Sequence, residues 1–152
     1  MSEGESLKLN MTPWRVAAIL WMALIFTLSS SLFAPKMSFD TTLDWFGVFN
    51  YFVRKCAHAT EFGVLVWLLF RSFYPTPMSM GRAQLWASAV SLLYAASDEY
   101  HQSFVPLRSG KASDVLFDAA GIVIVLLLIR YLKDASGSRL RDLVVGPRAE
   151  AQ

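Results

Sequence analysis

Four long apolar runs limit what this chain can fold into more than any other feature of its sequence. A helix needs roughly 20 consecutive apolar residues to cross the hydrocarbon core of a bilayer. The first, second and fourth runs approach that length. The third run is shorter and borders an acidic pair. The runs are Trp14–Phe33, Lys55–Tyr74, Ala83–Ser97 and Ser113–Leu132.

The overall composition agrees with a membrane protein. Hydrophobic residues make up 55% of the 152 residues and charged residues only 17%, whereas soluble domains carry roughly 25% charged residues. The net charge of +2 and the lack of a basic cluster argue against binding of nucleic acid. The single cysteine, Cys56, excludes an intramolecular disulfide. We therefore predict an all-α fold, a four-helix transmembrane bundle.

The segment Met37–Lys55, between the first two runs, is rich in aromatic residues whose spacing is roughly helical. Aromatic rings favour the interface between lipid and water, so the segment predicts a short interfacial helix between the first and second membrane helices. An ordinary connecting loop with an apolar underside is the alternative. Residues 1–12 are then an N-terminal segment, residues 13–133 the membrane domain, and residues 134–152 a flexible tail.

Four crossings place both termini on the same side of the membrane. That side carries nine of the 14 lysine and arginine residues. Because positively charged loops tend to stay in the cytoplasm, we expect both termini to be cytoplasmic.

The same topology gathers most of the polar side chains at one depth, near the outer boundary of the membrane. An ionisable group at the bilayer centre costs roughly 2.5–3.5 kcal/mol on insertion scales, so these groups should face one another and not lipid. They form either a functional site or a strut that clamps three helices. The set comprises His58, Glu61, Asp98, Glu99, His101, Gln102, Asp114 and Asp118, with Arg54, Lys55, Arg108 and Lys111 as basic partners.

Two segments carry these polar residues in a specific order: RKCAHATEFGVL at 54–65 and SDEYHQSFVPLRSGKASDVLFDAAG at 97–121. In them the chain resembles the VanZ-like family of small bacterial membrane proteins, from about Thr27 to Leu132. Leu107 stands where the family commonly has glycine. The matching positions are Lys55, His58, Glu61, Asp98, Glu99, Gln102, Pro106, Arg108, Asp114 and Gly121.

The resemblance implies four helices in a bacterial inner membrane and an association with resistance to the glycopeptide teicoplanin. We expect the polar pocket to bind or shield a membrane lipid, a lipid-linked envelope precursor or a glycopeptide, without turnover. A transporter is disfavoured because the inner halves of the four helices offer no continuous polar path.

The alternative is a membrane-embedded enzyme that acts on a phosphorylated lipid or a lipid-linked envelope substrate. In such an enzyme, imidazole and carboxylate groups would transfer protons and arginine would bind phosphate. Candidate catalytic residues are His58, Glu61, Asp98 and Glu99, and candidate substrate-binding residues are Lys55, Gln102, Arg108, Asp114 and Asp118.

No cofactor is expected from the main hypothesis. A divalent metal ion is a further alternative, because imidazole nitrogen and carboxylate oxygen suit zinc and similar ions. The candidate ligands are His58, Glu61, Asp98, Glu99 and His101.

Overall fold

The computed structural model describes residues 3–30, 44–74, 78–105, 111, 113–134 and 139–146. Within these residues the chain forms five helices and no strand, which confirms the all-α prediction. The helices are α1 (Glu3–Ser29), α2 (Asp44–Phe73), α3 (Met80–Gln102), α4 (Asp114–Leu132) and α5 (Arg139–Val144).

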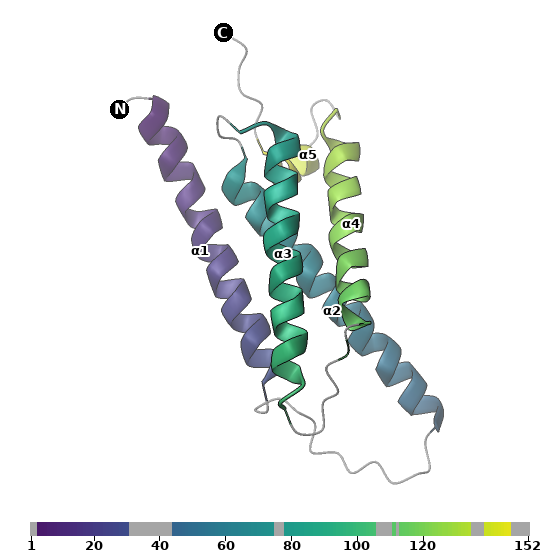
Figure 1. Ribbon diagram of the computed structural model, residues 1–152. Coiled ribbons are helices and arrows are strands. Elements are labelled where there is room, and N and C mark those ends of the chain that lie inside the picture. Colours follow the sequence, from purple (N-terminus) through teal and green to yellow (C-terminus); the bar gives the residue numbers. More distant parts are fainter. Residues whose placement is uncertain are drawn as a thin grey trace.

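The four long helices run alternately up and down, so each is antiparallel to the next (Figure 1). The start of α1 lies at the same end of the bundle as α5, while α3 ends and α4 begins at the opposite end. Helix α2 crosses obliquely behind α3, passes the start of α4, and contacts all three of the other long helices, most extensively α4. This arrangement makes α2 the centre of the bundle.

The core follows from that central position. The side chains of Phe62, Leu65 and Phe70 on α2 are completely buried. Hydrogen bonds to backbone carbonyls attach the middle of α1 to its neighbours. The indole Nε1 of Trp21 donates to the carbonyl of Glu61 at 2.9 Å, and the hydroxyl of Tyr94 donates to the carbonyl of Met22 at 2.6 Å. Both bonds join distant parts of the sequence and fix the position of α1 against α2 and α3.

A glycine sets the distance between α2 and α4. A Cβ atom built on Gly121 would lie 1.9 Å from the carbonyl oxygen of Ala59, far inside any normal contact. A Cβ on Gly63 would meet Val125 at 3.2 Å. Small residues therefore allow α2 and α4 to pack closely, and Gly121 is the position where a larger residue fits least.

The segment predicted as a separate interfacial helix is organised differently. From Asp44 onward the chain already belongs to α2, which continues without a break to Phe73. No proline interrupts this stretch. The prediction of a separate short helix is therefore wrong for residues 44–55, and residues 37–43 lie outside the described part.

Helix α3 extends five residues beyond the apolar run that predicted it. It ends at Gln102 and not at Ser97, so Asp98, Glu99 and His101 are helical residues. The backbone N–H of Ser103 still donates to the carbonyl of Glu99 at 3.1 Å. Polar side chains do not end a helix by themselves, because its backbone hydrogen bonds continue wherever neighbouring helices accept those side chains.

The predicted flexible tail contains α5, which packs near the end of α2. The indole of Trp67 donates to the carbonyl of Val144 at 3.1 Å, and the guanidinium of Arg71 donates to the carbonyl of Asp142 at 3.4 Å. Arg71 also lies over the ring of Trp14, 4.4 Å from its centroid. These contacts tie residues 139–146 to the bundle.

One described helix, α4, is both long and apolar enough to cross a membrane, and the run Pro13–Ser29 within α1 is a shorter apolar helix. Large apolar side chains are exposed on all five helices. Examples are Ile19 on α1 at 66% exposure, Leu93 on α3 at 72% and Ile124 on α4 at 65%. Exposed apolar side chains in this number suit a protein that contacts lipid.

Candidate functional site

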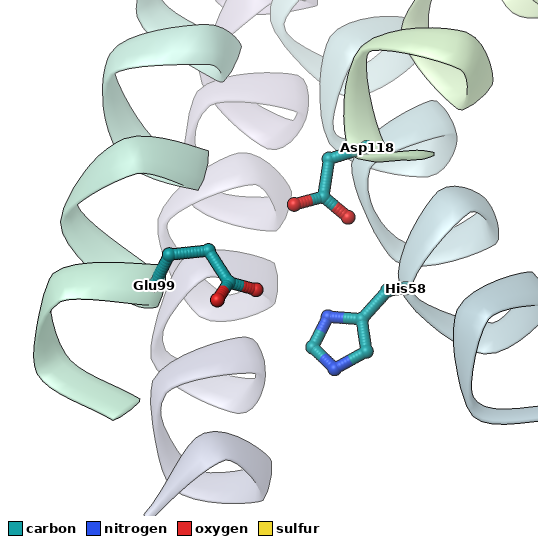
Figure 2. Close-up of side chains that lie close together, drawn as sticks. All are labelled: His58, Glu99 and Asp118. Atoms are coloured by element: carbon teal, nitrogen blue, oxygen red, sulfur yellow. The ribbon is translucent and has the colours of Figure 1, made fainter. Parts of the chain in front are cut away.

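Three helices each contribute one ionisable side chain to a cluster near the end of the bundle where α4 begins. The residues are His58 on α2, Glu99 on α3 and Asp118 on α4, and we call them the inner cluster. One nitrogen or oxygen atom from each lies within 4.8 Å of the other two. Figure 2 shows the three side chains directed toward a common point. The predicted meeting of the second, third and fourth helices at one polar level is thus present.

Asp118 is the most deeply placed member of the inner cluster. It is only 1% exposed. Among the described residues, neither of its carboxylate oxygens has a hydrogen-bond partner. A buried carboxylate without partners is costly, because it loses hydration and gains nothing in return. Both carboxylate oxygens of this acid are therefore available to a partner outside the described residues.

Glu99 is 6% exposed and is held by the backbone. Its Oε2 atom accepts a hydrogen bond from the N–H of Lys111 at 3.0 Å, just before α4 begins. This bond fixes the carboxylate and turns it toward the interior of the bundle.

Lys55 brings a positive charge to the edge of the cluster. Its ammonium forms an ion pair with Asp114 in the first turn of α4, and it lies 5.4 Å from the ring centroid of Phe117. One ammonium cannot balance the three carboxylates of Asp114, Glu99 and Asp118. Within the described residues, the site is therefore acidic.

Asp98 belongs to a separate buried network that faces α1. Its Oδ2 atom accepts hydrogen bonds from Gln102 Nε2 at 2.7 Å and from Ser29 Oγ at 3.0 Å. The amide of Gln102 also donates to Ser29 Oγ at 3.2 Å. Ser29 is the member that the sequence did not single out, because hydroxyls in apolar helices more often bond to a carbonyl of their own helix.

The remaining predicted residues lie at or beyond the margin of the cluster. Glu61 Oε2 is 3.8 Å from His58 Nδ1, so this acid borders the imidazole. His101 stacks on Phe26 of α1, with ring centroids 4.5 Å apart, and is therefore directed away from the inner cluster. Arg108 lies outside the described residues.

The predicted set of metal ligands changes accordingly. The structure places Asp118, which the sequence assigned to substrate binding, beside His58 and Glu99. Asp98 and His101 are engaged elsewhere, with Gln102 and Phe26. The arrangement of His58, Glu99 and Asp118 can hold a cation or transfer protons, since imidazole and carboxylate groups serve both purposes.

An apolar groove of about 420 Å³ also runs between α2, α4 and α5. It is lined by residues such as Gly63, Trp67 and Val125, and no member of the inner cluster contributes to it. The groove offers apolar contact but no acid or base. The chemistry of the described residues is therefore concentrated at the inner cluster.

The model of the family described as VanZ/LLP1 matches residues 14–133. The chain belongs to the VanZ-like family. The match covers all four long helices except the first part of α1. With the apolar helix α4, membership of this family marks the chain as a membrane protein. No curated protein and no solved structure matches the chain.

Proposed function

We propose that this VanZ-like protein spans the bacterial inner membrane four times, with both termini in the cytoplasm. In this position it binds the polar head group of a cell-envelope lipid or a lipid-linked envelope precursor at the end of the bundle that holds the inner cluster. A protective effect against teicoplanin would follow from that binding. The buried meeting of His58, Glu99 and Asp118 inside a bundle with apolar outer faces is the observation that carries the proposal.

Two features support binding over a purely structural role. A strut needs matched charges, whereas the described site has more carboxylates than cations and leaves Asp118 without a hydrogen-bond partner among the described residues. The exposed apolar faces of α1, α3 and α4 suit contact with acyl chains. An acidic, buried site of this kind would stabilise a cationic group of the bound head group.

Growth on teicoplanin tests the proposal. A susceptible strain would express the wild type, Glu99→Gln, Asp118→Asn or the control Asp134→Asn, whose side chain is 82% exposed. We expect the wild type and the control to raise the inhibitory concentration severalfold, and the two cluster variants to lose this effect at equal membrane levels on a blot. Full protection by both cluster variants, or none by the wild type, would contradict the proposal.

Lipid analysis of the purified protein provides an independent measurement. Lipids that remain bound after detergent extraction are compared with the total membrane extract by mass spectrometry. We expect one lipid class to be enriched with the wild type and with Asp134→Asn, and not with Glu99→Gln. The same lipid profile for all three proteins would mean that the cluster does not select a lipid.

A membrane-embedded enzyme is the second candidate, because an imidazole and two acids meet within 4.8 Å and Glu61 borders the imidazole. The two functions differ in how they respond to His58→Gln. Catalysis would collapse on loss of a proton-transferring group, whereas binding would weaken in steps as each contact is removed. A graded loss of protection across His58→Gln, Glu61→Gln and Glu99→Gln would favour binding.

A further inference from the structure

We propose that the inner cluster is a binding site for a divalent ion of the zinc or manganese type, held by His58, Glu99 and Asp118. This inference concerns the site discussed above, but it does not depend on any lipid or glycopeptide ligand. It rests on the geometry of the donor atoms, on the burial of Asp118, and on the excess of carboxylates over cations among the described residues of the site.

The donor atoms already lie close to coordination distance. For three atoms that are no more than 4.8 Å apart, some point lies within about 2.8 Å of all three. Zinc binds histidine nitrogen and carboxylate oxygen at roughly 2.0–2.2 Å. Movements of the donor atoms by roughly 0.6–0.8 Å would therefore bring all three into contact with one ion.

The types of donor narrow the choice of ion. One imidazole nitrogen with two carboxylates is a donor set that suits zinc, manganese and iron, whereas calcium and magnesium prefer oxygen alone. Three protein ligands also leave at least one coordination position open, as in catalytic zinc sites. The ligands come from α2, α3 and α4, so the ion would connect three helices.

The side chain of Asp118 gives an independent reason to expect a cation. It is 1% exposed and points into the cluster (Figure 2). Neither of its oxygens meets a hydrogen-bond donor among the described residues. An ion at the centre of the cluster would supply a positive partner for this buried acid.

The surrounding contacts would hold such an ion in place. The N–H of Lys111 fixes Glu99, as the outer partners of metal ligands usually do. Glu61 is close enough to His58 to orient the imidazole or to join the coordination. Lys55 forms an ion pair with Asp114 at the edge of the cluster.

Equilibrium dialysis of the full-length protein in detergent tests the inference. The protein would carry an affinity tag without histidine, and all versions would carry Cys56→Ser, because that thiol is exposed and could bind zinc on its own. After EDTA treatment, each protein is dialysed against Zn²⁺ or Mn²⁺, and bound metal is counted by mass spectrometry. We expect one equivalent of one of these ions per chain.

The variants Asp118→Asn and Glu99→Gln should bind the ion at least about 100-fold more weakly than the Cys56→Ser protein, which is the parent of all versions. The exposed control Asp134→Asn should bind the ion as tightly as this parent. The absorption spectrum of the Cys56→Ser protein loaded with Co²⁺ is a second measurement, and it needs no further variant. We expect a spectrum typical of nitrogen and oxygen ligands. The proposal is overturned if the parent binds no equivalent of either ion. It is equally overturned if Glu99→Gln binds like the parent.

Discussion

Replacement of Gly121 by alanine tests the packing on which the whole site depends. The added Cβ would lie 1.9 Å from the carbonyl oxygen of Ala59, and ordinary contact begins at 3.4 Å. Helices α2 and α4 would have to separate by about 1.5 Å at this level. Because the obstacle is backbone in a packed helix, it cannot rotate away as a flexible side chain can.

The expected cost follows from two opposing effects. Overpacking in a core costs typically about 1–3 kcal/mol, and a backbone clash belongs at the upper end of that range. Alanine regains about 0.8–1.0 kcal/mol of helix propensity over glycine. The net loss is about 2 kcal/mol, which lowers the ratio of folded to unfolded protein roughly 30-fold. For a chain of this size the midpoint of thermal unfolding should fall by about 4–8 °C.

Thermal unfolding of the purified protein in detergent, followed by tryptophan fluorescence, measures this change. Gly81→Ala on α3 is the matched control, because a Cβ there has no neighbour within 4 Å. The control should be as stable as the wild type or more stable by up to about 1 kcal/mol. If Gly121→Ala unfolds at the same temperature as Gly81→Ala, then α2 and α4 do not approach as closely as described.

Two further predictions concern contacts at either end of the bundle. Lys55→Gln should destabilise the protein by about 2–3 kcal/mol, because it leaves Asp114 without its ammonium partner beside other acids. If Asp114→Asn is added, the double variant should recover part of that loss. A double-mutant cycle of unfolding temperatures measures this coupling. Additive losses would show that the pair does not interact. Trp67→Phe should cost about 1 kcal/mol through loss of the bond to Val144, and amide hydrogen exchange should accelerate in residues 139–146 and not in α4. Unchanged exchange in α5 would mean that this bond does not hold it.

The sequence predicted the parts of this structure that follow from hydrophobic pattern and topology. Four apolar runs indicated four helices, and their alternation brought distant polar residues to one level. The close approach at Gly121 was also predictable, since a glycine within an apolar helix usually marks a tight contact.

Sequence alone did not reveal which acids converge. Asp98 and Glu99 are neighbours on α3, so their side chains diverge by about 100° around the helix. The rotation of α3 directs Asp98 to α1 and Glu99 to the inner cluster. That rotation is set by packing along the whole helix, and no local pattern specifies it. The continuation of α2 back to Asp44 was missed for a related reason, because aromatic residues suit both an interfacial segment and a helix.

No two members of the inner cluster belong to the same helix. The cluster therefore cannot form until α4, the last of the long helices to be synthesised, has packed against α2. Until then, His58 and Glu99 lack their third partner. Completion of this site is thus a late step in biogenesis, and a chain truncated before α4 would lack it entirely.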